Sequence, residues 1–262
     1  MSQPKILVID VETAPLLNYC WGVWDQNVGL NQIKSDWHLL SFSAKWLGKK
    51  EVIYKDQRNA KNIEDDTSLL KDIWSLLDEC DIVLTHNGKK FDIKKINARF
   101  IANGLPPPSS FRHVDTLGIA RKHFAFTSNK LEFLTQHLKC KVTKLTERKF
   151  KGFDLWKECL NGNKLAWKEM EKYNKQDVLA LEELYKKLAP WDNSVNMFVF
   201  QSGENKQTCT CGSTSFLKRG FRYTNTGKFQ RYRCNSCSKE HTDGVNLLGK
   251  GQGGPGTSQV KR

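Results

Sequence analysis

The chain has 262 residues, of which 39 % are hydrophobic and 11 % aromatic, which suffices for one α/β domain plus a small module. Its formal net charge of +14 favours a polyanionic partner, most often nucleic acid, although a lysine-rich solvated surface would give the same number. No apolar run approaches the roughly 18 residues of a membrane span. Acids follow the first residues at once, so no signal peptide is expected. We expect a cytoplasmic protein without a membrane partner.

The first predicted element is a strand that begins at Ile6, in an apolar run rich in β-branched residues. Asp10 and Glu12 interrupt this run, and the two-residue period of a strand puts both carboxylates on one face. Two adjacent buried charges of one sign are costly unless cations neutralise them. Either the strand ends at Ile9 and both acids are solvated, or Asp10 and Glu12 bind a divalent metal ion.

Residues 14–37 have no regular pattern and contain Trp21, Trp24 and Trp37. We expect these tryptophans to pack in the core, and a loop that stacks on bases is the alternative.

The rest of the first 192 residues alternates strand and helix patterns. Strands are predicted over 39–46, 51–54 and 82–85, and a further strand end over 113–116. Helices are predicted at 69–77 (capped by Asp66 or Thr67), 93–100, 117–124, 131–138 and 165–188. This order predicts an α/β fold, a sheet covered by helices.

Beyond this domain, 1–192, the chain changes character. Residues 193–207 are polar and aperiodic and are interpreted as a linker. A cysteine-rich module follows at 208–245, and the glycine-rich basic stretch 246–262 is predicted to be disordered.

Further acids can join the pair on the first strand. Asp92 opens the helix after the strand 82–85, although an acid there also simply complements the helix dipole. Tyr173 and Asp177 lie four residues apart and therefore on one face of the long helix. That face continues as an apolar stripe through Leu181, Leu184 and Leu188. An unpaired carboxylate in line with that stripe is costly, so Asp177 is either solvated at its edge or neutralised by a metal ion.

Four carboxylates with a tyrosine suit phosphodiester hydrolysis by two metal ions, and oxygen ligands favour Mg²⁺ or Mn²⁺ over zinc. Three segments carry these residues: Ile-Asp-Val-Glu-Thr at 9–13, His-Asn-Gly-Lys-Lys-Phe-Asp at 86–92 and Tyr-Asn-Lys-Gln-Asp at 173–177. In order and spacing they resemble the three motifs of the DEDD superfamily of 3′–5′ exonucleases. The Tyr-x-x-x-Asp spacing matches its tyrosine subclass, which includes proofreading domains of family A and B DNA polymerases. The histidine subclass has His five residues before the last Asp, where this chain has Lys172.

The resemblance spans about residues 5–190 and implies a ribonuclease H-like mixed sheet flanked by helices. The chain has no room for a polymerase and resembles stand-alone exonucleases of phages and bacteria, which implies a bacterial or phage-infected host cell. By the same resemblance, Asp10, Glu12 and Asp177 bind metal directly, and Asp92 binds it directly or through water.

The resemblance also assigns residues around the ligands. Tyr173 would orient the attacking water or help to deprotonate it. Thr13, Asn87 and Phe91 would contact the 3′-terminal nucleotide. Asp115 either supports the site or is simply a helix N-cap.

Near the C-terminus, Cys209 and Cys211 form a CxC pair and Cys234 and Cys237 form a CxxC pair, with 22 residues between the two pairs. Two such pairs predict a zinc ribbon with four thiolate ligands that needs its metal to fold. His241, four residues past the last cysteine, could replace one ligand.

Basic and aromatic residues alternate between the two cysteine pairs, which suits phosphate contacts and base stacking. The candidate nucleic-acid contacts are Arg219, Arg222, Arg231 and Arg233. This stretch also resembles zinc ribbons of some transposases, which implies DNA binding.

We therefore predict a 3′–5′ exonuclease that releases nucleoside 5′-monophosphates from DNA, expected to be single-stranded or frayed, with two Mg²⁺ or Mn²⁺ ions and one structural Zn²⁺. We expect a monomer that acts in DNA replication or DNA repair, with replication or recombination proteins as candidate partners. The alternatives are an exoribonuclease, a ribonuclease H-like endonuclease, a nucleotide phosphodiesterase and a non-enzymatic zinc-ribbon protein that binds nucleic acid.

Overall fold

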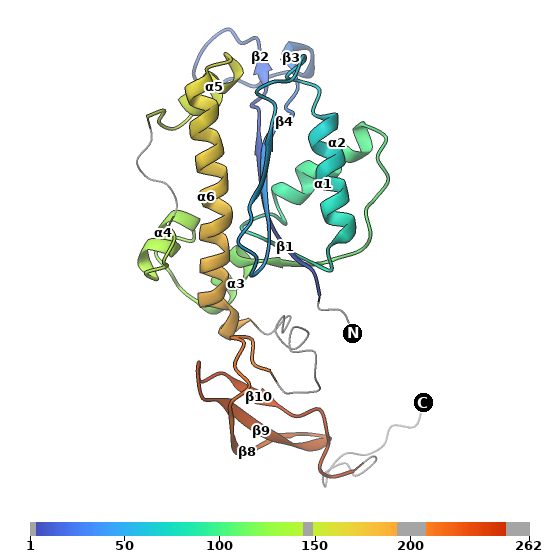
Figure 1. Ribbon diagram of the computed structural model, residues 1–262, viewed down its shortest axis with the longest axis vertical. Coiled ribbons are helices and arrows are strands. Elements are labelled where there is room, and N and C mark those ends of the chain that lie inside the picture. Colours follow the sequence, from blue (N-terminus) through green and yellow to red (C-terminus); the bar gives the residue numbers. More distant parts are fainter. Residues whose placement is uncertain (1–3, 144–148, 193–207, 250–262) are drawn as a thin grey trace. The chain divides into compact units, whose positions relative to one another are not determined.

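The computed structural model describes residues 4–143, 149–192 and 208–249 (Figure 1). The chain divides into two compact units, Pro4–Lys187 and a second that is built mainly from Leu188 onward, and each is described by itself. The predicted linker 193–207 and residues 250–262 of the predicted tail lie outside the described residues. No helix within the described ranges is long and apolar enough to cross a membrane.

A five-stranded mixed sheet forms the centre of the first unit, with strand order β5-β4-β1-β6-β7. β1 is central: it pairs antiparallel with β4 and parallel with β6, which in turn pairs parallel with β7. The strands are β1 (Ile6–Thr13), β4 (Leu39–Trp46), β5 (Ile53–Asp56), β6 (Ile82–Thr85) and β7 (Arg112–Asp115). The predicted α/β class is confirmed, and the strand predicted over 51–54 lies two residues later, at Ile53–Asp56.

Helices cover both faces of this sheet, with α1 and α2 on one face and α6 along the other (Figure 1). The helices of the first unit are α1 (Thr67–Glu79), α2 (Asp92–Ala102), α3 (Thr116–His123), α4 (Leu131–His137), α5 (Asp154–Leu160) and α6 (Lys164–Leu188). The sequence predicted each of them except α5.

The alternation of β1 divides its side chains between these two layers. Leu7, Ile9 and Val11 belong to the hydrophobic cluster that includes buried residues of α1 and α2. Asp10 and Glu12 therefore project from the opposite face, where α6 lies. The strand continues to Thr13, so the interpretation that it ends at Ile9 is wrong.

The stretch 14–37 is more ordered than predicted. β2 (Leu17–Asn18) pairs antiparallel with β3 (Ile33–Ser35), and a short 3₁₀ helix, η1 (Leu30–Gln32), precedes β3. Trp21 and Trp24 are 99 % and 84 % exposed, so the prediction that they pack in the core is wrong. The local sequence offered no amphipathic period that could have placed them.

The second unit contains a three-stranded sheet with the order β10-β9-β8. Its strands are β8 (Phe216–Thr224), β9 (Gly227–Cys234) and β10 (Glu240–Thr242), and both neighbouring pairs are antiparallel. A second 3₁₀ helix, η2 (Ala189–Trp191), follows α6. The predicted small β module is present.

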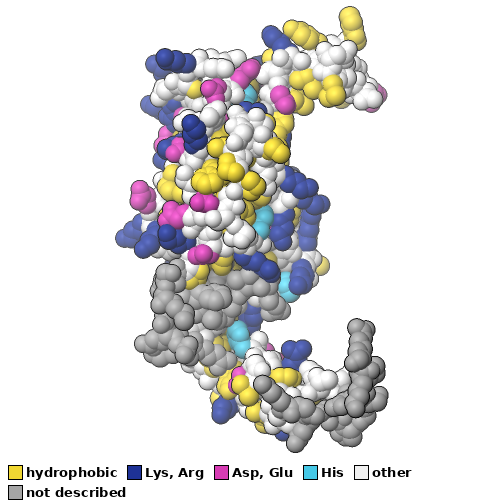
Figure 2. Space-filling model, turned by 90° about the vertical axis from the view of Figure 1, so that its right-hand side faces the viewer, with side chains coloured by type: hydrophobic (Ala, Val, Ile, Leu, Met, Phe, Trp, Pro, Cys, Tyr) yellow, Lys and Arg dark blue, Asp and Glu magenta, His cyan; other side chains and the backbone are white. Residues whose placement is uncertain are grey.

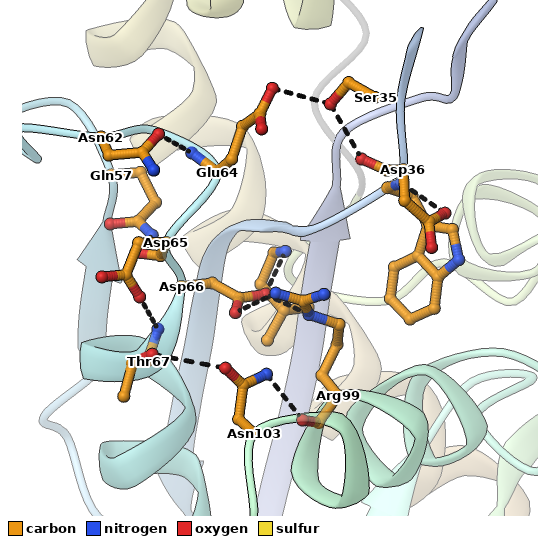
Figure 3. A network of polar contacts seen from close by, with 12 residues as sticks. Ser35, Asp36, Gln57, Asn62, Glu64, Asp65, Asp66, Thr67, Arg99 and Asn103 are labelled. Atoms are coloured by element: carbon orange, nitrogen blue, oxygen red, sulfur yellow. Dashed lines mark hydrogen bonds and ion pairs between the residues drawn. The ribbon is translucent and has the colours of Figure 1, made fainter. Parts of the chain in front are cut away.

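A buried carboxylate joins three elements of the first unit (Figure 3). Asp66 is fully buried and accepts hydrogen bonds from Leu39 N (2.8 Å) and from Nε and Nη2 of Arg99 (2.9 and 2.7 Å). It occupies the N-cap position of α1, but its side chain makes no capping bond; instead Asp65 accepts from Thr67 N at 3.1 Å. Asp66 therefore takes the predicted N-cap position, but Asp65 supplies the side-chain hydrogen bond there, because the Asp66 carboxylate is bound to α2 and β4.

Replacing Asp66 by Asn is expected to lower the free energy of unfolding by about 3–5 kcal/mol, because the Arg99 guanidinium loses its buried counter-charge. Asp65→Asn, the same substitution one residue away at an exposed cap, is the matched control and is expected to change stability little. Urea unfolding followed by circular dichroism measures both. Equal midpoints for the two variants would contradict the assignment.

Candidate functional site

Three carboxylates converge between the sheet and α6. Asp10 and Glu12 come from β1 and Asp177 from α6, and each offers an oxygen within 4.8 Å of the others. Asp177 is 4 % exposed, and the two β1 acids are half-buried. Three like charges this close repel one another strongly, and a divalent cation removes that repulsion. The donor set is all oxygen, which fits Mg²⁺ or Mn²⁺.

Polar contacts fix how α6 lies against the sheet. Nδ2 of the fully buried Asn174 donates to Asp10 Oδ2 at 2.6 Å, and its Oδ1 accepts from Ser41 Oγ at 3.3 Å. Two turns further along, Glu182 forms a buried ion pair with Lys45 of β4. Asp177 lies between these two anchors on the helix, so its carboxylate is held toward β1.

Two aromatic side chains, Trp156 and Tyr173, pack together beside the triad. Trp156 of α5 donates from Nε1 to Glu12 Oε2 at 3.1 Å. Its indole packs edge-on against Tyr173, with 6.0 Å between ring centroids and an interplanar angle of 79°. Tyr173 is buried in the cluster formed by α5, α6, Ala14 and Leu40. Tyr173 is thus linked through one indole to a carboxylate of the triad.

Asp92 lies apart from the triad. Its Oδ1 accepts a hydrogen bond from Val11 N at 3.2 Å, and Val11 is the β1 residue between Asp10 and Glu12. Burial raises the pKa of Asp92 to about 6, and this amide hydrogen bond opposes the rise. The structure brings the other three predicted ligands together and places Asp92 at the strand that carries two of them.

A cleft of about 490 Å³ opens at the triad, with Asp10 and Asp177 on its wall. Its other lining residues belong to the His86-Asn87 turn, to α3 and to the stretch that leads into α4, and include Arg121 and Lys130. The cleft therefore combines acids with two cations, which suits a phosphate group beside a metal ion.

The turn beside the cleft is held tightly. Asn87 has a left-handed backbone (φ 69°), and a Cβ on Gly88 would lie 2.4 Å from Thr85 Oγ1. Asp115 accepts from the backbone N of Asn87 (2.9 Å), Lys89 (3.1 Å) and Leu117 (3.0 Å). Asp115 is thus the predicted N-cap of α3, and it also orders the turn beside the cleft.

The remaining predicted substrate contacts in this unit lie near the acids. Thr13 is the half-buried last residue of β1, and Phe91 is 39 % exposed at the start of α2 beside Asp92. Asn87 is a wall of the cleft.

The second cluster consists of the four predicted zinc ligands, Cys209, Cys211, Cys234 and Cys237, whose sulfur atoms lie within 4.8 Å of one another. Burial opposes ionisation of the Cys234 thiol, but the backbone amides of Cys237 and Ser236 outweigh it and lower its pKa to about 6. Four mutually close thiols with one ionised readily fit a tetrahedral zinc site. His241 Nε2 lies 3.1 Å from Cys209 Sγ, so a fifth donor adjoins the four.

Strand register places a basic residue opposite an aromatic one on each face of this module, and Arg222 pairs with Phe229 on the face away from Phe221 and Tyr223. Tyr223 pairs with Lys228 and Phe221 with Gln230, and the Lys228 ammonium lies 4.0 Å from the Phe221 ring centroid. Arginines occupy the alternate positions Arg222, Arg231 and Arg233, with Arg219 at the irregularity in the β8–β9 register. Arg231 also lies 3.5 Å from Glu240, so part of its charge is compensated.

Comparison with known proteins shows the family to which the chain belongs. A model of the RNase_H superfamily matches residues 28–189. The chain belongs to the RNase_H superfamily. The matched range contains Asp92 and Asp177 but begins after Asp10 and Glu12, so the pairing of the β1 acids with Asp177 rests on the geometry described above.

The fold also resembles that of a solved family B DNA polymerase from the hyperthermophilic archaeon Pyrobaculum calidifontis. The TM-score is 0.50 at 10 % sequence identity, and the match covers 76 % of this chain and 26 % of the polymerase. The chain thus spans about a quarter of that protein's length, and the likeness concerns the fold. No curated protein sequence shows a significant match.

Sequence reasoning missed two residues that hold the acids in place. Asn174 is three residues before Asp177, so the helical period could have put it on the same face. Trp156 is 144 residues away from Glu12 in the chain, and no local pattern indicates their contact.

Asn174→Ala is expected to weaken Mn²⁺ binding about 10- to 100-fold, because Asp10 loses the donor that orients it. Gln176→Ala, which removes an amide on the same helix that bonds to Thr143 O, is the control and should leave the affinity unchanged. Isothermal titration calorimetry measures both. The positioning role is refuted if Asn174→Ala binds Mn²⁺ as tightly as the wild type.

Proposed function

We propose that the protein is a metal-dependent 3′–5′ exonuclease of the DEDD tyrosine subclass that acts on DNA. The RNase_H superfamily fold supports a nuclease that acts on nucleic acid. The observation that carries the finer proposal is the convergence of Asp10, Glu12 and Asp177, with Tyr173 one helical turn before Asp177 on α6.

Asp10, Glu12 and Asp177 would hold the divalent ions, with Asp92 close to the strand that carries the first two. Bound at such a site, two ions would supply electrophilic stabilisation of the attacking and leaving oxygens of a phosphodiester. The chain's own side chains do the rest. Asn174 and Trp156 fix the orientation of the carboxylates, and Tyr173 orients the attacking water by a hydrogen bond.

The cleft residues would position the substrate. Arg121 and Lys130 can neutralise phosphate charge beside the acids, and the ordered Asn87 turn gives the terminal nucleotide a fixed wall. A single-stranded or frayed 3′ end suits this site, because a terminal base must be free to enter a cleft of about 490 Å³.

The C-terminal module would bind nucleic acid and raise its concentration near the cleft. Support comes from charge: residues 200–262 contain 11 Lys and Arg against 3 Asp and Glu. The face with Phe221 and Tyr223 would stack on bases, and the face with Arg222, Arg231 and Arg233 would contact phosphates.

The activity test uses 5′-labelled single- and double-stranded DNA and RNA with Mg²⁺ or Mn²⁺. The expected result is a DNA ladder that shortens from the 3′ end and is abolished by EDTA. A circular single strand should survive, since it has no end. Cleavage of the circle would indicate the endonuclease, and faster shortening of RNA would indicate the exoribonuclease.

Asp10→Asn and Asp177→Asn are expected to abolish cleavage, because each removes a carboxylate of the triad. Tyr173→Phe should lower kcat by about 10²-fold with little change in KM. Asp154→Asn, at an exposed acid of α5, is the control and should keep wild-type rates. An active Asp177→Asn variant would overturn the proposed ligand set.

The zinc proposal has its own test. Titration of the thiols with a mercurial should release about one zinc equivalent per chain, detected with a metallochromic dye. Cys234→Ser should lose this zinc and weaken DNA binding, whereas Cys20→Ser, at the exposed thiol outside the cluster, should retain both. Zinc retention in Cys234→Ser would point to His241 as a replacement ligand.

A further inference from the structure

The stretch Leu16–Leu30 presents an unusually apolar surface to solvent. Within the described residues, 18 large hydrophobic side chains are exposed, and eight of them fall in these 15 residues. They are Leu16, Leu17, Tyr19, Trp21, Val23, Trp24, Val28 and Leu30. Figure 2 shows hydrophobic side chains projecting from the end of the unit where Figure 1 places β2 and β3. A contiguous patch of this kind marks a binding surface, unlike scattered exposed residues.

The backbone holds this patch in place. Tyr19 N donates to Gln32 O at 2.9 Å, and Gln32 Nε2 donates back to Tyr19 O at 3.0 Å. Gly29 N also donates to Gln32 Oε1 at 2.7 Å. The two ends of the stretch are therefore fastened together, while Trp21 and Trp24 between them stay in solvent.

Both ends of the stretch lead to elements that carry residues of the candidate active site. It begins three residues after Thr13, the last residue of the strand that carries Asp10 and Glu12. At its other end, past β3, the half-buried Trp37 ring has the Lys95 ammonium 3.6 Å from its centroid. Lys95 also lies 5.8 Å from the ring centroid of Phe91, the neighbour of Asp92.

Charge identifies the partner that fits. The stretch 16–30 carries one charged residue, Asp25, so it offers no cation to a phosphate. Cations lie instead on the neighbouring α2 and the turn before it, where Lys89, Lys90 and Lys94 are exposed and Lys95 is half-buried. A polyanion with flat, uncharged groups that extend away from its phosphates fits this arrangement: the flat groups match the apolar stretch 16–30, and the phosphates match the lysines. Unpaired nucleotides have that structure, whereas a duplex hides its base faces.

We propose that Tyr19, Trp21 and Trp24 form a stacking platform for unpaired bases of the substrate strand, upstream of the 3′ end in the cleft. This inference rests on the proposed exonuclease function, and it adds a preference for single strands long enough to reach the platform. Base stacking on aromatic rings is tolerant of sequence, which suits an enzyme that removes any nucleotide.

Two double variants test whether the bases stack on aromatic rings or only contact an apolar surface. Trp21→Leu/Trp24→Leu keeps an apolar surface and loses the aromatic faces, whereas Trp21→Phe/Trp24→Phe keeps them. Fluorescence anisotropy with a labelled oligo-dT of about 16 nucleotides, in EDTA, should show at least tenfold weaker binding for the Leu pair. The Phe pair should bind within about threefold of the wild type. Leu30→Ala, in the same stretch, is the control and should change nothing.

Wild-type binding by the Leu pair would overturn the proposal and indicate an apolar protein partner for the patch. An equal loss in Leu30→Ala would do the same. Circular dichroism checks that all variants fold, which is expected because the altered side chains lie in solvent.

Substrate length distinguishes this inference from the exonuclease proposal. With Mg²⁺, the Leu pair should raise KM for a strand of about 16 nucleotides and leave kcat/KM for one of about 4 nucleotides unchanged. If no substrate is cleaved, the exonuclease proposal fails, while the metal-free binding assay still tests the platform.

Cys20 gives an independent readout, because it is exposed beside Trp21 while the other seven cysteines are buried or half-buried. An environment-sensitive fluorophore on Cys20 should respond to oligo-dT and not to a blunt duplex.

Discussion

The candidate active site depends on one polar contact layer, the one between α6 and the central sheet. An α-helix packed only by leucines can slide or rotate at small cost, since apolar contacts have no direction. Asn174 and Glu182 supply direction, because each must meet a specific partner on β1 or β4. Once those partners are met, the rotation of the helix is set and Asp177 faces Asp10. Burial of these groups is tolerable because each is paired.

The sequence predicted much of this arrangement because short-range periodicity determines it. Period 2 put Asp10 and Glu12 on one face, and the helical period did the same for Tyr173 and Asp177. The apolar stripe through Leu181, Leu184 and Leu188 is buried as its spacing implied. The α/β class followed from the alternation of strand and helix patterns.

What could not be predicted depends on contacts between distant residues or on exposure. The indole of Trp156 meets Glu12 across 144 residues of chain, which no periodicity encodes. Asp66 sits where a helix cap belongs, yet its carboxylate serves Arg99 and the β4 backbone. Trp21 and Trp24 were expected inside the core from their residue type alone, and the stretch they occupy is held open to solvent by backbone bonds at its ends.

The 164 residues between Asp10 and Asn174 have a consequence for the protein's synthesis. A ribosome makes the chain from the N-terminus, so β1 and its two acids emerge long before the helix that completes the site. Until α6 docks, Asp10 lacks the Asn174 amide that orients it. A growing chain therefore lacks the assembled acidic triad until α6 has been made. The same order means that a chain truncated before α6 cannot assemble the triad, however well its N-terminal strands pair.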